Sequence, residues 1–392
     1  MLTKRLYDSD SYLRDFSAIV LRCERLKPSD AEKRSDDAAF AIVLDQTAFF
    51  PEGGGQTSDT GNLGSATVLD VQEINGEIIH YTDSELETGS LVRGVLNWQA
   101  RFRKMQNHTG EHLVSGIVHT QFGYDNVGFH LGTDGVTVDF SGVLSEAELR
   151  FVEYIANRVV GLNVPVTVSY PSPEECAVLD YRSKLELTEN VRIVTIDGWD
   201  CCACCAPHVS QTGAVGGVKI LSSESWKGGV RVHMLCGMDA LDDYQKRCEN
   251  TARISAMLSA PQLETADAVE RLMQNLQHAR EESAILRRAL LDSRIAALKQ
   301  TDGNILIFDS LLDSNSLRNL VNAGVKLCGG VCGAFCGNDT DGYRYIIGSE
   351  SVGLRAWSKD FNQALHGKGG GSDQMIQGTV SATSEQIRLY LQ

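Results

Sequence analysis

Short, mostly apolar runs separated by turn residues dominate the first hundred positions of the chain. Such runs occupy residues 18–21, 41–44 and 66–69, with polar and glycine-containing segments between them. Short runs bounded by turn residues are typical of strands, whereas an amphipathic helix repeats its apolar positions every 3.6 residues. The pattern predicts a small, barrel-like antiparallel β-domain over residues 1–95.

Residues 96–238 mix helical and strand-like patterns. A helix is expected over residues 107–122 and another over 145–160, where Ser145 and Glu148 have the spacing of a capping box. Strand-like stretches occur at residues 136–140, 164–170 and 191–196. This mixture predicts an α+β domain.

The segment 239–300 has a helical composition that lacks glycine and is interrupted only by Pro261. Its apolar residues, with polar Ser283 in the series, recur at alternating spacings of three and four, at Val269, Leu272, Leu276, Ala279, Leu286 and Leu290. A heptad seam of this kind predicts either a helix packed on its own domain or a coiled coil between two copies. We therefore expect a helical linker and a possible homodimer through residues 239–300 and the C-terminal domain.

The last segment, residues 301–392, again alternates strand and helix patterns. Strands are expected at residues 304–308 and 343–348, on either side of a stretch rich in Gly and Cys, and helices at 354–365 and 384–390. The pattern predicts a small α/β domain.

Composition places the whole chain among globular proteins. Of its 392 residues 42% are hydrophobic and 22% charged, and the formal net charge is −15. No apolar run approaches the ~20 residues of a membrane helix, and the first residues do not resemble a signal peptide, so a cytoplasmic protein is expected. Residues 1–245 carry 20 basic and 35 acidic residues, which argues against indiscriminate binding of nucleic acid.

Two pairs of residues have the spacing of metal ligands. His108 and His112 stand one helical turn apart, and Cys204 and His208 form a second pair with the same spacing. Three imidazoles and a thiolate make a complete tetrahedral set for zinc. Eleven cysteines without an export signal also indicate metal ligands or reduced thiols rather than disulfides. Three neighbouring cysteines remain alternatives or additions to Cys204: Cys201, Cys202 and Cys205.

Two other interpretations of these motifs, a zinc protease and a redox-active cysteine pair, have less support. His108, Glu111 and His112 match the inverted zinc-protease pattern, in which the glutamate acts as general base. The downstream ligand pair, however, lies in a loop that contains cysteine and proline, and a fourth protein ligand leaves no position for a zinc-bound water. A redox-active Cys-x-x-Cys such as Cys201 with Cys204 is also less favoured, because nothing else resembles a thioredoxin-like unit.

Three separated strings resemble one family. Residues 49–56 (FFPEGGGQ), the histidine pair, and the Cys204 and His208 pair followed by Thr212-Gly213 resemble the editing domain of alanyl-tRNA synthetase and its freestanding AlaX relatives. Residues 367–371 and 375–378 resemble the end of the DHH-associated domain that closes this synthetase, as in a long-form AlaX protein. We find no class II motif for ATP and no upstream Asp-His-His motif. One departure is Cys205-Ala206-Pro207, where the family commonly has two glycines and a threonine.

The resemblance implies a zinc-dependent trans-editing hydrolase that acts on mischarged tRNA(Ala), chiefly with serine and possibly with glycine, without aminoacylation activity. It carries the zinc ligands over to His108, His112, Cys204 and His208. A zinc-stabilised tRNA-binding protein without catalysis remains the alternative from a different class of function.

Further site residues are expected around these ligands. Gln56 is a candidate to hold a hydroxyl or the amino group of the substrate, and Thr109 to sense the serine hydroxyl. His130 is a candidate partner of the scissile ester, and Glu111 either supports a metal-bound imidazole or faces solvent. The residues expected to contact substrate or tRNA are Gly53, Gly54, Gly55, Arg101, Arg103, Lys104, Lys368, Gly369, Gly370 and Gly371.

Overall fold

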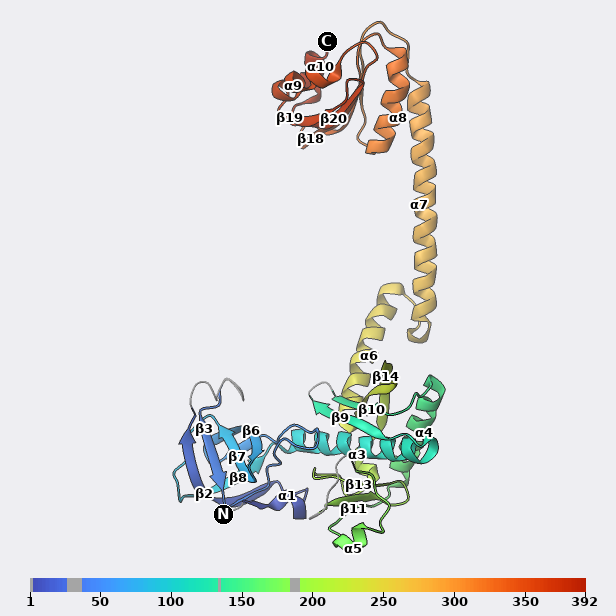
Figure 1. The fold of residues 1–392 in the computed structure, drawn as a ribbon. Coiled ribbons are helices and arrows are strands. Elements are labelled where there is room, and N and C mark those ends of the chain that lie inside the picture. The colour runs from blue at the N-terminus through green and yellow to red at the C-terminus, as the bar shows by residue number, and fades with distance from the viewer. Residues whose placement is uncertain (1–2, 27–36, 133–134, 184–190) are drawn as a thin grey trace. The chain divides into compact units, whose positions relative to one another are not determined.

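A computed structural model describes residues 3–26, 37–132, 135–183 and 191–392 (Figure 1). Its chain contacts form two compact units, residues 1–252 and 253–392. The four-part division predicted from the sequence is finer than these two units and stays a prediction.

Unit 1 begins with a closed barrel of six antiparallel strands in the order β2-β3-β7-β6-β5-β8. Phe16, Ala18 and Val20 of β2 point into its core, and their neighbours along the strand are exposed. The predicted small antiparallel β-domain is therefore confirmed. The strands are β2 (Asp15–Arg25), β3 (Phe40–Leu44), β5 (Gly61–Leu63), β6 (Ala66–Ile74), β7 (Glu77–Thr82) and β8 (Leu91–Leu96). Ahead of and beside the barrel lie β1 (Lys4–Arg5), α1 (Leu6–Ser9) and β4 (Gln46–Thr47).

The longest described helix of unit 1, α3 (Trp98–Phe122), lies between two small sheets and contacts strands of both (Figure 1). One sheet has the order β14-β15-β10-β9 and the other β11-β12-β13. The strands of the first are β9 (Asn126–Gly132), β10 (Gly135–Phe140), β14 (Val218–Trp226) and β15 (Gly229–Cys236). Those of the second are β11 (Val166–Ser169), β12 (Ile193–Ile196) and β13 (Asp200–Ala203). Both sheets are antiparallel and pack against helix α3, as is typical of an α+β fold.

Helix α3 begins at Trp98 and not at residue 107 as expected. Asn97 caps it, because its Oδ1 accepts a hydrogen bond of 3.2 Å from the N–H of Ala100. Its first turns carry three cations, but Trp98, Phe102 and Met105 also recur there at spacings of four and three and pack on the core, a helical pattern that the sequence analysis did not use. The helix ends at Gly123, whose φ of 70° only glycine adopts readily.

Helix α4 (Glu146–Leu162) packs its buried face against α3. Ser145 and Glu148 form the predicted capping box, each side chain bonding the backbone N–H of the other. The expected strands are present as β10, β11 and β12, with ends that differ by a few residues. The short elements of this region are α5 (Pro173–Cys176) and the 3-10 turn η1 (Thr212–Val215).

Two helices follow: α6 (Gly237–Leu258) and α7 (Thr265–Ala296). The break at Pro261 is where the sequence predicted it, and a 3-10 turn η2 (Gln262–Glu264) leads into α7. Leu291 of α7 is buried against the C-terminal domain. Other apolar side chains of α7 are between 40% and 69% exposed within this chain: Val269, Leu272, Met273, Leu276, Ile285 and Leu286.

The C-terminal part of unit 2 is a five-stranded sheet in the order β16-β17-β18-β20-β19, in which only β16 and β17 pair in parallel. The predicted strands and helices are present. The strands are β16 (Ile305–Phe308), β17 (Cys332–Asn338), β18 (Gly342–Gly348), β19 (Gly367–Gly371) and β20 (Met375–Val380). The helical elements are α8 (Ser314–Gly324), η3 (Val325–Leu327), α9 (Leu354–Ala364) and α10 (Ser384–Tyr390). Among the described residues, no helix combines the length and the apolar character needed to cross a membrane.

Candidate metal centre

The middle of α3 is buried on every side, from Met105 to Val118. A helix covered all round is normally apolar, because a buried polar group is unfavourable unless it is hydrogen-bonded or bound to a metal. Half of this segment is nevertheless polar: Gln106, Asn107, His108, Thr109, Glu111, His112 and Ser115. These side chains indicate a functional site between the two sheets.

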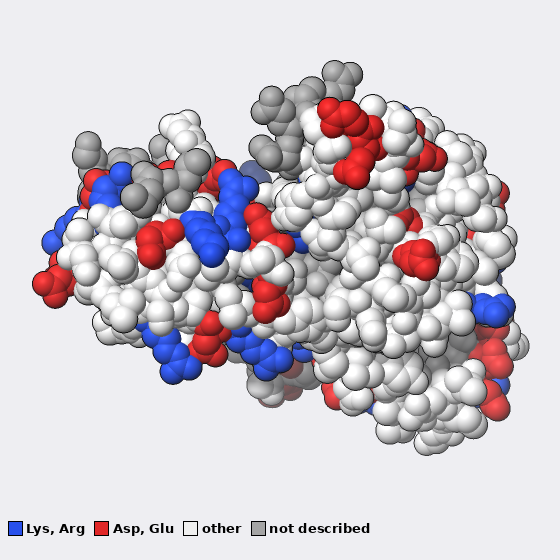
Figure 2. Space-filling model, turned by 90° about the horizontal axis from the view of Figure 1, so that it is seen from below, with Lys and Arg blue, Asp and Glu red and all other residues white. Residues whose placement is uncertain are grey.

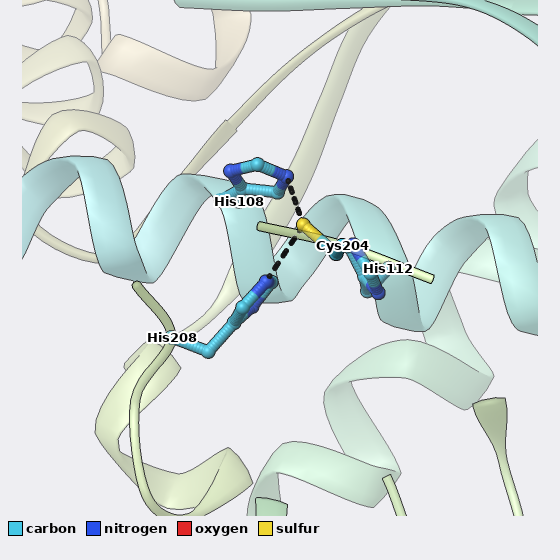
Figure 3. Close-up of side chains that lie close together, drawn as sticks. All are labelled: His108, His112, Cys204 and His208. Carbon is cyan, nitrogen blue, oxygen red and sulfur yellow. Dashed lines mark hydrogen bonds between the residues drawn. The ribbon is translucent and has the colours of Figure 1, made fainter. Parts of the chain in front are cut away.

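The four predicted metal ligands converge at one point. His108 and His112 come from α3, and Cys204 and His208 come from the segment that follows β13 (Figure 3). One ligand atom from each residue lies within 4.8 Å of the others. The Cys204 Sγ is 3.5 Å from His108 Nε2 and 3.4 Å from His208 Nε2. Tetrahedral zinc, with bonds of about 2.0 to 2.3 Å, requires ligand separations of roughly 3.3 to 3.6 Å, and both sulfur–nitrogen distances lie in this range.

Each histidine of the cluster has its Nδ1 held by a different side chain. Gln56 Oε1 lies 2.9 Å from His108 Nδ1, and Asp200 Oδ2 lies 3.0 Å from His112 Nδ1. Thr109 Oγ1 lies 3.0 Å from His208 Nδ1. A ligand histidine that binds a metal through Nε2 has its proton on Nδ1, and such outer partners select that tautomer and fix the ring. The arrangement leaves all three Nε2 atoms for the metal.

The charges of the ligands also suit a metal. Burial lowers the pKa of His208 to about 3, so its imidazole is neutral. Burial would raise the pKa of the Cys204 thiol, but His108 and His208 outweigh it and hold that pKa well below its usual value. Burial likewise opposes the charge on His112, yet Cys202 and Asp200 raise its pKa well above the usual value. Metal binding there must displace a proton, so affinity is expected to fall in acid.

Two arginines hold the segments that carry the ligands. Arg182 donates from Nε and Nη2 to both oxygens of Asp200, at 2.7 and 3.0 Å. Arg192, which is 7% exposed, donates from Nη1 to the carbonyls of Cys204 and Ala206, at 2.7 and 2.9 Å. The Cys204 N–H in turn donates to the Arg192 carbonyl at 3.0 Å. The peptide of the ligand cysteine is therefore bound on both sides.

The other cysteines of the segment do not group with all three histidines. Cys202 groups with His112 and Asp200 alone. Cys201 accepts a hydrogen bond of 3.8 Å from Thr195 Oγ1. Among the described residues, Cys204 is the sulfur that groups with the three histidines.

The glycine-rich segment forms a tight turn against β9. The N–H and carbonyl of Gly53 bond those of Gln56, each at 3.0 Å, and Gly54 and Gly55 have φ of 59° and 82°. Both central residues therefore need the left-handed region, as in a type I′ turn. A Cβ on Gly55 would lie 2.6 Å from the Phe129 carbonyl oxygen. The turn is what places Gln56 beside His108.

Two family descriptions match the segments that build this site. Residues 191–233, which include Cys204 and His208, match the Threonyl and Alanyl tRNA synthetase second additional domain. Residues 6–100, which include Gln56, match the tRNA synthetases of class II (A). The second match qualifies the expectation from the sequence, where no class II motif was found.

Relatives extend the likeness over the whole chain. The chain is 26% identical to the alanyl-tRNA editing protein Aarsd1 of Danio rerio, over 95% of this chain and 93% of that protein. It is 30% identical to the alanine–tRNA ligase of Ignicoccus hospitalis and 29% identical to that of Pyrococcus abyssi, over 82% and 98% of this chain. The chain is a homologue of alanyl-tRNA editing proteins and alanine–tRNA ligases. It spans 36% and 42% of the length of the two ligases.

Two candidates on α3 have partners that the sequence did not predict. Thr109 is fully buried, and its hydroxyl bonds His208 and accepts from the N–H of Val209 at 3.2 Å. Glu111 was expected to support an imidazole or to face solvent, and the structure contradicts both expectations. Its carboxylate is buried and accepts hydrogen bonds from Ser115 Oγ and Asn126 Nδ2. The carboxylate that supports a ligand imidazole is that of Asp200, beside His112.

His130 is exposed on β9 and does not join the cluster. Successive side chains of a strand point to opposite faces. The neighbouring Phe129 faces His108, with ring centroids 4.7 Å apart, so His130 points away from it.

The predicted basic cluster on α3 is corrected, because all three cations are engaged within the protein. Arg101 is 1% exposed and pairs with Asp59, to which its Nε donates at 2.7 Å. Arg103 pairs with Asp239 and Asp242, at 2.5 and 2.6 Å. Lys104 donates to the carbonyls of Thr57 and Ser58. Their charges balance acids or backbone dipoles of unit 1.

Positive charge on the barrel is also interrupted by acids. Figure 2 shows Lys and Arg gathered on the barrel side of one face, with Asp and Glu between them. Ion pairs in and beside the barrel join Arg5 with Glu73, Arg22 with Glu77, and Arg93 with Asp15. Among the described residues, this face of unit 1 therefore offers no uninterrupted cationic stripe to a polyanion.

The C-terminal glycine segment forms a strand rather than a loop. Residues Gly367–Gly371 are β19, at the edge of the sheet next to β20. A Cβ on Gly369 would lie 2.4 Å from Tyr345 Oη and from the Gln377 carbonyl oxygen, so packing accounts for this glycine. Lys368 is exposed. A contact of Lys368, Gly369, Gly370 and Gly371 with substrate stays a prediction.

Asp200, Arg182 and Arg192 were missed by the sequence reasoning. Asp200 lies 88 positions from His112 and is one of 51 acidic residues, so nothing local marks it. Its place immediately before the run of cysteines is the one signal that points to it.

Proposed function

We propose that the chain is an editing hydrolase that removes a wrong amino acid, chiefly serine and also glycine, from tRNA(Ala). Zinc is its cofactor, bound by His108, His112, Cys204 and His208, and the cytoplasm its location. The observation that carries the proposal is the set of three histidines whose Nε2 atoms converge on one thiolate while each Nδ1 is held by a separate partner. The names of its relatives supply the substrate class.

Such an activity has a physical reason. A synthetase pocket for alanine cannot strongly reject a substrate that only adds a hydroxyl or lacks a methyl group, so a second site must remove the error. The sequence shows no class II motif that would bind ATP, and on that ground we expect no aminoacylation from the chain.

The residues at the site have different roles. Bound zinc would supply a positive charge that orients the aminoacyl ester. Gln56 is fully buried, its Oε1 is used by His108, and its Nε2 has no partner among the described residues. That N–H can donate to a hydroxyl or carbonyl oxygen of the substrate, and it is unsuited to an ammonium group. Thr109 positions His208, so its role is to hold a ligand rather than to read the serine.

A zinc-stabilised tRNA-binding protein without catalysis would share the same metal site. The assay that separates the two uses purified protein with seryl-, glycyl- and alanyl-tRNA(Ala). We expect release of serine and glycine, with alanyl-tRNA(Ala) left intact. Zinc-loaded protein that binds the tRNA and releases no amino acid would establish the second function. Cleavage of peptides would instead indicate the zinc protease.

We further propose that two copies associate through α7 and the C-terminal domain. The apolar heptad positions of α7 that are exposed in the single chain support a coiled coil. Light scattering of the full chain should give twice the mass of one chain. The double variant Leu272→Glu with Leu276→Glu should give the mass of a single chain. A monomeric wild type, or a dimer that survives both substitutions, would refute this contact.

A further inference from the structure

Gln56 carries a hydrogen-bond donor that is buried beside the candidate metal centre and has no partner. Its side chain is fully buried, its Oε1 lies 2.9 Å from His108 Nδ1, and its Nε2 bonds no atom among the described residues. Asp59 and Arg192 are the other described side chains with an unpaired buried nitrogen or oxygen, and neither of them bonds a ligand imidazole. Buried amide donors are normally paired, because an unpaired one is unfavourable. The free N–H of Gln56 therefore indicates an acceptor that arrives with the substrate.

The free atom of this amide must be its nitrogen and not its oxygen. His108 turns its Nε2 toward Cys204 Sγ, at 3.5 Å, where a metal would bind, so the proton of the ring is on Nδ1. The Nδ1–H group can bond only the acceptor atom of the amide, which is Oε1. A half-turn of the amide would bring two donors together and break this bond. Nε2 is therefore held as a donor in one direction.

The backbone of Gln56 is fixed as well. Its N–H and carbonyl bond those of Gly53, each at 3.0 Å, and the residue forms a bridge with Leu131 of β9. The Leu131 N–H also donates to the Gly55 carbonyl at 2.7 Å. Because both the main chain and the amide oxygen are engaged, the donor cannot turn toward another acceptor. The group that lies beside it decides whether it is paired.

We propose that this one donor separates serine and glycine from alanine. The inference rests on the proposed function, in which seryl and glycyl esters are hydrolysed and alanyl esters are spared. The hydroxyl of serine accepts from Gln56 Nε2. Glycine leaves a space of roughly one water, ~30 Å³, and a water there accepts from Nε2 and bonds the polar atoms of the substrate. The methyl group of alanine fills the same space, offers no acceptor and leaves the donor unpaired.

The size of a pocket alone cannot make this selection. Alanine is larger than glycine and smaller than serine, so no limit on size excludes it and admits the other two. A site built to hydrogen-bond a hydroxyl, in contrast, rejects an analogue that lacks the hydroxyl. The cost of leaving one buried donor unpaired corresponds to a factor of roughly 5 to 150 against alanine.

The test compares kcat/KM for the release of serine, glycine and alanine from tRNA(Ala) by the full zinc-loaded chain and by Gln56→Met. Methionine has nearly the shape of glutamine and no donor. We expect kcat/KM for serine relative to alanine, and for glycine relative to alanine, each to fall by about 5- to 150-fold. Both ratios are taken within one variant, so a uniform loss caused by the unsupported His108 ring cancels.

Thr109→Val is the matched control, because Thr109 lies 3.0 Å from His208 Nδ1 and supports that ring as Gln56 supports His108. Both variants should weaken zinc binding by about 10- to 100-fold, measured by competition with a chelator, so the rates are compared in excess zinc. Thr109→Val should lower the three rates alike and keep both ratios. Dissociation constants of amide-linked seryl-, glycyl- and alanyl-adenosine, which are not esters, should give the same ratios without catalysis.

Unchanged ratios in Gln56→Met would overturn the inference, as would an equal fall in Thr109→Val. A fall in the serine ratio without a fall in the glycine ratio would contradict the water that stands in for the hydroxyl. A wild type that releases alanine as fast as serine would also contradict the inference. No release of any amino acid by the wild type contradicts the proposed function itself. If the wild type releases serine and glycine and Gln56→Met keeps the same preference, only the role of Gln56 is wrong.

Discussion

Cys204→Ala should abolish zinc retention and serine release, whereas Cys205→Ala should leave both near the wild-type values. Cys204 is the sulfur that groups with the three histidines, and His108 and His208 hold its thiol pKa well below the usual value, in the thiolate form a metal requires. Loss of an outer partner typically weakens a metal site 10- to 100-fold, and loss of a ligand should weaken it by at least ~100-fold. Metal content after dialysis, competition with a chromophoric chelator and initial rates of deacylation measure the effect.

Cys205 is the matched control because it is the adjacent cysteine. Cys205 is exposed, and its Sγ lies near Gly54 rather than in the cluster. If Cys205→Ala loses the metal and Cys204→Ala retains it, the assignment of the sulfur ligand is wrong.

Arg101→Met should lower the free energy of unfolding by about 3 to 5 kcal/mol, the loss expected when one partner of a buried ion pair is removed. The side chains of Arg101 and Asp59 are 0% and 2% exposed. The arginine also donates to the Ala48 carbonyl at 2.6 Å, while Asp59 accepts the Phe50 N–H at 2.7 Å. Removing the cation therefore leaves a buried carboxylate without its partner. Urea unfolding of the full chain, followed by tryptophan fluorescence, measures the change.

Arg103→Met on the same helix is the control, and it should lose about 1 kcal/mol or less because its ion pairs are partly exposed. Arg101→Met with Asp59→Leu should be more stable than Arg101→Met alone, since no unpaired charge then remains. If Arg101→Met unfolds like the wild type but binds tRNA more weakly, the original prediction of a surface contact is right and the buried pair is not important for stability.

The ligand set could be predicted from the sequence because its geometry is local. His108 and His112, like Cys204 and His208, stand at i and i+4, and only one long-range step joins the two pairs. The residues that hold the ligands are different, since Gln56 and Asp200 come from segments 52 and 88 positions away from the histidines they bond. No periodicity marks such contacts.

Burial of charge was the other feature that the sequence could not show. Arg101, Arg103 and Lys104 form a cationic run in the sequence, but each meets an acid or carbonyl contributed by another segment. The fold was easier to predict, since the barrel strands and the break at Pro261 follow from local patterns.

The central claim is that this chain removes a wrong amino acid from tRNA(Ala) with the help of the metal at Cys204 and its three histidines. The most direct measurement follows serine released from seryl-tRNA(Ala) by purified full-length chain as prepared, after chelation, and after zinc is restored. The account predicts rapid release, loss of at least ~100-fold on chelation, and recovery with one zinc per chain. Release that is unchanged by chelation, when metal analysis shows the site to be empty, would contradict it, and so would no release by the zinc-loaded protein.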